Sequence, residues 1–103
     1  MKPGRLLVAL AVLSLPMPAA AAPRTATLVI DKMKFGPMPT GLRAGDRLTI
    51  VNRDIFRHTA TARPAFDLDL PAGKGGIVTL KAGTFAVTCR YHPGMRATLI
   101  VGK

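Results

Sequence analysis

From residue 25 onward the chain alternates short apolar runs with glycine, proline and aspartate, and no segment keeps a helical period. Runs rich in Val, Ile, Thr and Leu that alternate with period two are typical of strands. They predict strands over Thr25–Asp31, Met33–Phe35, Arg47–Asn52, His58–Ala62, Gly76–Lys81, Thr84–Cys89 and Ala97–Val101. The hydrophobic pattern therefore predicts an all-β domain.

Turn-forming residues separate these runs at short intervals. Glycine stands with proline, aspartate or lysine at residues 43–46, 71–74 and 81–83. Such residues favour tight turns, and their spacing is that of short strands in a two-sheet sandwich. We expect a Greek-key β-sandwich of about seven to eight strands, preceded by an N-terminal signal peptide.

The alternation also predicts which side chains face the core. Leu48 and Ile50 share one face of their strand, and Cys89 shares a face with Val87. Cys89 is therefore expected to point inward, at the point where the chain leaves its strand. The loop 90–96 then crosses one end of the sandwich, which the polar turn 53–57 can reach as well.

A different pattern fills the first 21 residues. Lys2 and Arg5 precede an apolar stretch at 6–15, and small residues follow it. This order is typical of a secretory signal peptide, and the stretch is shorter than the roughly 20 residues that span a bilayer. We expect cleavage between Ala21 and Ala22, which leaves one exported domain at residues 22–103, located in the periplasm and without a membrane span.

The charge is strongly positive, with 15 Lys and Arg against 5 acidic residues and a net charge of +10. Nucleic acid would suit that charge, but export and an aromatic content of 5% argue against it. Arg53, Arg57, Arg63, Arg90 and Arg96 fall in or beside segments expected at the loop end of the sandwich. They predict a basic face that attracts acidic partners, unless the charge is simply scattered over a solvated surface.

The chain has one cysteine and two histidines. An exported protein with a lone Cys has no intramolecular disulfide, so the thiol is either a buried apolar group or a metal ligand. The spacing favours a ligand, because His92 and Met95 follow Cys89 at intervals of three. With His58 they supply a thiolate, two imidazoles and a thioether, the donors of a blue-copper site.

With these residues in place, the chain resembles the cupredoxins. The likeness rests on the order of the four predicted ligands and on Gly45-Asp46, Asn52-Arg53, Gly83-Thr84-Phe85 and His92-Pro93, and it covers nearly all of the exported domain. Within the family it is similar to amicyanin and to the plastocyanin-like and pseudoazurin-like electron carriers. The amicyanin ligand loop has the same Cys-x-x-His-x-x-Met spacing.

The resemblance implies one type 1 copper ion and a role for each ligand. Cys89 would carry the electron path and the colour, His58 would be the buried imidazole, and Met95 the long axial ligand. His92 would be the electron port, and its ring is expected to leave reduced copper and take a proton in acid. Amicyanin has Asn where this chain has Thr59, so the Thr hydroxyl either replaces the side-chain bond between the two ligand loops or leaves it unmade.

Three functions are compatible with these features. The first is a one-electron carrier, a monomer that meets acidic periplasmic redox proteins, such as a dehydrogenase or a c-type cytochrome, near His92. The second is a copper-binding protein for delivery or tolerance, and the third is a colourless cupredoxin-like interaction domain. His92 is expected to emerge through an apolar patch of Met38, Pro39, Phe56, Pro64 and Pro93, unless these are ordinary loop packing. No catalytic constellation is visible, so no enzyme is expected.

Overall fold

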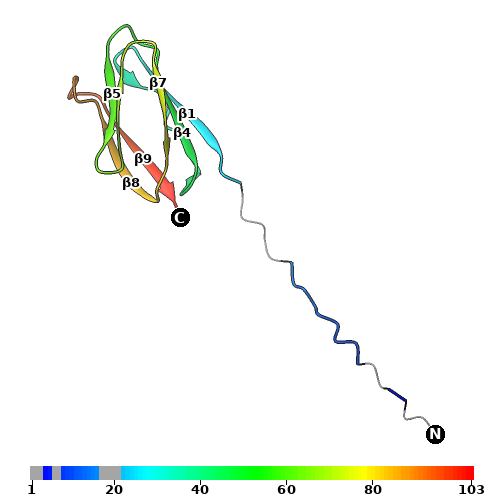
Figure 1. Ribbon diagram of the computed structural model, residues 1–103. Coiled ribbons are helices and arrows are strands. Elements are labelled where there is room, and N and C mark those ends of the chain that lie inside the picture. Colours follow the sequence, from blue (N-terminus) through cyan, green and yellow to red (C-terminus); the bar gives the residue numbers. More distant parts are fainter. Residues whose placement is uncertain (1–3, 6–7, 17–21) are drawn as a thin grey trace.

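The computed structural model describes residues 4–5, 8–16 and 22–103, and within these it has nine strands and no helix (Figure 1). The strands are β1 (Thr25–Asp31), β2 (Lys34–Phe35), β3 (Leu42–Arg43), β4 (Arg47–Asn52), β5 (His58–Ala62), β6 (Phe66–Leu70), β7 (Gly75–Thr79), β8 (Gly83–Thr88) and β9 (Arg96–Gly102). The predicted all-β sandwich is confirmed.

Two sheets form the sandwich. The smaller sheet has the order β2-β1-β4-β7 and the larger one β3-β9-β8-β5-β6. Most neighbours are antiparallel, but two pairs are parallel: β3 with β9, and β1 with β4, where Thr25 lies opposite Arg47 and Ile30 opposite Asn52. Non-consecutive strands are therefore neighbours in both sheets, as in a Greek-key sandwich.

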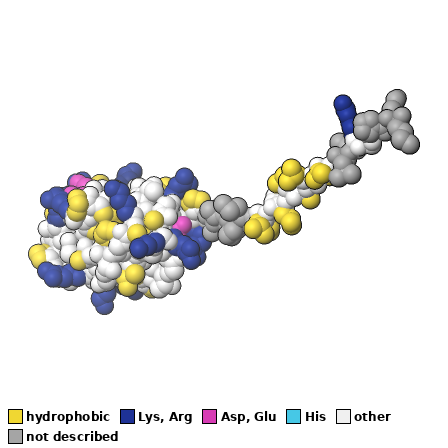
Figure 2. Space-filling view, turned by 90° about the horizontal axis from the view of Figure 1, so that it is seen from below, with side chains coloured by type: hydrophobic (Ala, Val, Ile, Leu, Met, Phe, Trp, Pro, Cys, Tyr) yellow, Lys and Arg dark blue, Asp and Glu magenta, His cyan; other side chains and the backbone are white. Residues whose placement is uncertain are grey.

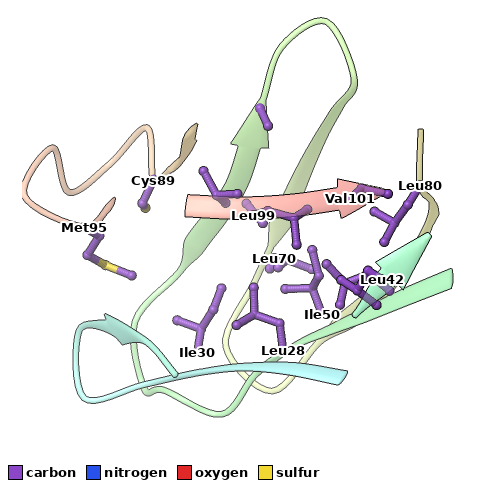
Figure 3. Close-up of a cluster of buried hydrophobic side chains, with 14 residues drawn as sticks. Leu28, Ile30, Leu42, Ile50, Leu70, Leu80, Cys89, Met95, Leu99 and Val101 are labelled. Carbon is purple, nitrogen blue, oxygen red and sulfur yellow. The ribbon is translucent and has the colours of Figure 1, made fainter. Parts of the chain in front are cut away.

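The core lies between the sheets and follows the predicted alternation. Leu28, Leu48, Ile50 and Leu99 have no exposed surface, and Cys89 is 2% exposed. Figure 3 shows Leu28, Ile50 and Leu99 between the two layers, with Cys89 toward one end of the cluster. The predicted inward orientation of Leu48, Ile50 and Cys89 is confirmed.

Two strands were not predicted from the sequence. β3 has only two residues, and β6 holds Asp67 and Asp69, a residue type that strands disfavour. β6 tolerates them because it is an edge strand whose aspartates face outward, while Leu70 is 2% exposed and packs in the core. The sandwich consequently has nine strands rather than seven or eight.

The two ends of the sandwich are distinct. The turn at residues 43–46, in which Gly45 has a φ of 92°, lies beside the last strand, since the Ala44 N–H bonds to the Gly102 carbonyl. The loop between β8 and β9 lies at the opposite end (Figure 1). The turn 53–57 joins it there, because it leads into His58.

The predicted signal peptide is only partly covered. Residues 1–3, 6–7 and 17–21 lie outside the described residues. Of the two residues at the predicted cleavage site, Ala21 is therefore not described and Ala22 is. Residues 8–16 have no regular secondary structure. Among the residues that the structure describes, no helix is long and apolar enough to cross a membrane.

Candidate metal centre

Three potential metal donors converge at the loop end of the sandwich. His58 begins β5, Cys89 directly follows β8, and His92 lies in the next loop. The Nδ1 atoms of the two histidines are 3.1 Å apart, and the Cys89 Sγ lies 3.7 Å from Nδ1 of His58 and 3.6 Å from Nδ1 of His92. The structure thus brings together three of the four residues predicted as ligands.

These separations fit a single metal ion. With bonds of about 2.0 Å to nitrogen and about 2.3 Å to sulfur, donors around one ion lie roughly 3.3 to 3.7 Å apart. The three donor atoms already have nearly this spacing without any movement of the backbone. A thiolate and two imidazoles with a thioether nearby suit copper in both oxidation states, and the cluster fits one type 1 copper ion.

Met95 ends the same loop. Its side chain is 5% exposed and belongs to the buried cluster that includes Cys89, and Figure 3 shows both residues at the same end of the core. Two backbone hydrogen bonds close the loop, because the Cys89 N–H donates to the Met95 carbonyl and the Met95 N–H to the His92 carbonyl. The backbone of Met95 is therefore tied to Cys89 and His92, two of the three converging residues.

Asn52 shapes the turn that delivers His58. Its side chain has no exposed surface, and its amide donates to the carbonyls of Phe56 (2.7 Å) and Leu70 (2.9 Å). Its side-chain oxygen accepts the N–H of Asp54 at 2.9 Å. One buried amide thus satisfies three backbone groups and fixes the path of the turn.

Replacing Asn52 with Ala is expected to lower the free energy of unfolding by about 2 to 4 kcal/mol. The substitution leaves the buried carbonyl of Leu70 and the partly buried carbonyl of Phe56 without a donor, and each such group costs about 1 to 3 kcal/mol. Urea unfolding of the metal-free protein measures the loss. Thr49→Ala, on the same strand, is the control, and an equal loss in the two variants would contradict this role for the amide.

Asp54, which the sequence did not single out, orients His58. Its Oδ2 lies 2.7 Å from Nε2 of the fully buried imidazole. An ionised carboxylate can only accept a hydrogen bond, so Nε2 carries the hydrogen. Nδ1 then has a free lone pair, which faces Cys89 and His92 and can bind a metal ion. The bond to His58 holds the pKa of Asp54 below its usual range, and although burial works to lower the pKa of His58, its bonds to Asp54 and Cys89 outweigh burial and raise it.

Thr59 contacts both ligand loops. Its backbone N–H donates to the Cys89 Sγ at 3.3 Å, and its hydroxyl oxygen accepts the N–H of Arg90 at 2.9 Å. Of the two alternatives for Thr59, the structure has the one in which the hydroxyl joins the loops. Burial works to raise the pKa of the Cys89 thiol, but the Thr59 N–H and the two imidazoles beside the sulfur outweigh it and lower this pKa to about 6.

The thiol pKa predicts how the metal-free protein responds to pH. The ultraviolet absorbance of the Cys89 thiolate is expected to appear as pH rises through about 6. An unfolded thiol has a pKa of about 8.5, so this ionisation stabilises the fold fully above that value, and the contribution is lost as pH falls through about 6. Cys89→Ser provides the blank, and a midpoint above pH 8 would contradict the prediction.

The predicted basic face is partly neutralised. Arg57 pairs with Asp69 at 2.9 Å, and Arg63 and Arg90 both reach Asp67, at 2.7 and 3.2 Å. In the part of the chain that the structure describes, Arg53 and Arg96 form no ion pair. Basic side chains also spread over the face seen in Figure 2, so the positive charge is not confined to the metal end.

The predicted apolar patch gathers only in part. The ring of Phe56 meets that of His92 edge-on, with centroids 6.4 Å apart. Met38 and Pro39 instead line a groove of about 420 Å³ with Ile100 and other residues of β3 and β9, and Pro64 lies in the β5–β6 turn, at the far end of β5 from the donors. Ile55, which was not predicted, is 82% exposed beside Phe56, where the apolar pair interrupts a polar turn.

Similarity to known proteins agrees with this geometry. The sequence model of the cupredoxin-like domain matches residues 4–101. The Cu(I) form of a methionine-to-alanine mutant of amicyanin is 26% identical, with a TM-score of 0.61 over 81% of this chain and 87% of that chain. A purple cupredoxin from Nitrosopumilus maritimus is 18% identical, with a TM-score of 0.65 over 75% of this chain and 99% of that chain.

A larger protein shares the fold. A copper-containing nitrite reductase from Thermus scotoductus is 24% identical, with a TM-score of 0.69, over 86% of this chain but only 25% of that chain. No curated protein sequence matches.

Proposed function

The chain belongs to the cupredoxin family, and we propose that it is a periplasmic blue-copper protein that carries one electron at a time. The proposed ligands are His58, Cys89, His92 and Met95. The observation that carries the proposal is the convergence of one thiol sulfur and two imidazole nitrogens within 4.8 Å of one another. Bound copper supplies a Cu(I)/Cu(II) couple.

The protein's part in this function is to hold the donors still. Asp54 fixes the ring of His58, the Thr59 N–H fixes the Cys89 sulfur, and backbone bonds close the loop to Met95. Donors held by such outer contacts keep their positions when the charge of the site changes. This arrangement suits a carrier, which gains and loses an electron without changing shape.

His92 is the proposed electron port. It is half-buried, whereas His58 at the same site has no exposed surface. Phe56 contacts its ring, and Ile55 and Tyr91 beside it are 82% and 45% exposed. We propose that a redox partner docks on this apolar surface, close to the exposed edge of the imidazole.

We propose further that the partner is acidic. Arg53 and Arg96 flank the ligand loops, and no carboxylate among the described residues pairs with either. Opposite charge steers partners toward a docking surface and accelerates their encounter, an effect that salt screens. Electron transfer to an acidic partner should therefore slow as ionic strength rises.

A carrier is favoured over copper delivery and over an enzyme. Delivery needs a site that exchanges its metal, whereas His58, Cys89 and Met95 are all buried here. The likeness to the nitrite reductase covers only a quarter of that protein, so it supports a shared fold and not a shared activity. Among the described residues, one cluster of histidine and cysteine donors is present, and it is the cluster that a carrier requires.

Export remains part of the proposal. Residues 1–21 would act as the signal peptide, with cleavage between Ala21 and Ala22 and copper bound afterwards in the periplasm. The mass of the protein recovered from a periplasmic fraction tests the cleavage site. Full-length protein in the cytoplasm would contradict it.

The decisive experiment is a spectrum of the exported domain after one equivalent of Cu(II). The proposal predicts a strong blue absorption band and narrow copper hyperfine splitting in electron paramagnetic resonance. A pale solution with ordinary splitting would mean that copper is bound elsewhere, and it would overturn the assignment.

A further inference from the structure

A chain of side-chain hydrogen bonds runs across the outer face of β5 and β6 and ends on the residue that follows Cys89. The Arg90 N–H donates to the Thr59 hydroxyl at 2.9 Å, and that hydroxyl lies 2.8 Å from the hydroxyl of Thr61. Thr61 donates to Asp67 Oδ1 at 2.7 Å. The Arg90 side chain also reaches Asp67 Oδ1, through Nε at 3.2 Å, so the chain closes into a ring.

The hydrogens in this ring can point in only one direction. Asp67 is ionised, because its bonds from Arg63 and Thr61 hold its pKa below the usual range, and a carboxylate only accepts. Thr61 must therefore give its hydrogen to Asp67 and accept the one from Thr59. Thr59 in turn has its oxygen free for the Arg90 N–H, so each bond orients the next.

The ring reaches the metal centre at two points. Thr59 also donates its backbone N–H to the Cys89 sulfur, and Arg90 is the next residue after Cys89. Thr59 has no exposed surface and Thr61 is 7% exposed, so water does not compete for the bond between their hydroxyls. Asp67 and Arg90, at the outer side of the ring, are partly exposed. Hydrogen bonds that share members support one another, so removing Thr61 from the buried side loosens the rest.

We propose that Thr61 and Asp67 are positioning residues for the metal centre, which they reach through Thr59 and Arg90. This inference rests on the proposed function. Neither residue touches a proposed ligand, and both belong to strands rather than to the ligand loops. Through them, the edge strand β6 holds the backbone N–H of Thr59 against the thiolate.

The bond from the Thr59 N–H favours the electron-rich reduced site, because hydrogen bonds to sulfur stabilise its negative charge. Thr61→Val, which keeps the shape but removes the hydroxyl, should weaken Cu(I) binding relative to Cu(II) by up to tenfold. For a one-electron couple that is a fall in potential of up to about 59 mV. Thr61→Ser keeps the hydroxyl and should restore the native potential, and Thr98→Val makes the same change on the exposed face of β9 as a control.

A second measurement needs no copper. In the metal-free protein, amide hydrogen exchange at Arg90 should become about two- to tenfold faster in Thr61→Val, as expected for the loss of one hydrogen bond. Thr61→Ser and Thr98→Val should exchange like the native protein. If Thr61→Val does not fold, Thr61→Ala carries the same two tests.

The outcomes separate this inference from the proposed function. A native protein without a blue band would overturn the proposed function, while faster exchange at Arg90 in Thr61→Val would still support the ring. A blue native protein whose potential and Arg90 exchange are the same in Thr61→Val, Thr61→Ser and Thr98→Val would overturn the inference and leave the carrier assignment intact.

Discussion

Cys89→Ser is expected to abolish the blue colour and to weaken copper binding by more than roughly 100-fold. Loss of a residue that only hydrogen-bonds to a ligand already costs up to about 100-fold, and Cys89 is itself a proposed ligand. The thiolate is the only soft anionic donor in the cluster, and serine offers a hydroxyl that stays protonated near neutral pH. The two imidazoles remain, with their Nδ1 atoms 3.1 Å apart, so some copper can still bind. Its absorption should be weak, and its hyperfine splitting should be that of ordinary copper.

The substitution is well suited to this test because the fold should survive it. The Cys89 side chain is 2% exposed, and serine has nearly the same shape, so it can still accept the Thr59 N–H. Thermal unfolding of the metal-free variant should confirm this.

Met95→Gln is the matched change at the weakest proposed ligand, and it should keep both copper and colour while shifting the potential. A Cys89→Ser protein that stays intensely blue would refute the whole assignment.

The fold could be predicted to the extent that hydrophobic alternation determines it. Leu48 and Ile50 lie two positions apart, as do Val87 and Cys89, and each is buried in the structure. β6 was not predicted because Asp67 and Asp69 are a residue type that strands disfavour, although Leu68 and Leu70 alternate with them. An edge strand needs only one face for the core, so its other face can hold charge.

The metal centre could be predicted for a different reason. The chain has one cysteine and two histidines, so the spacing of Cys89, His92 and Met95 indicated a shared site. The residues that hydrogen-bond to these ligands, or to their neighbours, are common residue types, and their positions in the sequence do not distinguish them from other polar residues. Asp54 and Thr61 become notable only when the fold brings one to the back of His58 and the other to the side chain of Thr59.

The charge prediction shows the limit of sequence reasoning most clearly. Arg57, Arg63 and Arg90 were predicted to form a basic face, but they lie beside Asp67 and Asp69. The pairing depends on β6, which the sequence pattern did not predict. Missing one strand therefore altered the predicted surface as well as the predicted sheet.

Asp54 sits behind the buried imidazole as the only side-chain partner of its Nε2 atom among the described contacts. The carboxylate is 8% exposed, and its other bonds come from the N–H groups of Met33 (2.9 Å) and Ile55 (2.8 Å). These contacts fix the carboxylate before any metal binds. A negative charge held here makes the imidazole a stronger donor and favours Cu(II) over Cu(I).

Asp54→Asn is therefore expected to weaken Cu(II) binding by about 10- to 100-fold and to raise the reduction potential. The amide oxygen can still accept from His58, but the charge is lost and the amide nitrogen faces the N–H of Ile55. Competition with a chelator measures the affinity, and a redox titration followed at the blue band measures the potential. Asp31→Asn is the control, because among the described residues that exposed carboxylate accepts from the Lys32 N–H alone. If both variants bind Cu(II) as tightly as the native protein, the carboxylate does not tune the metal centre, and His58 is held by its burial alone.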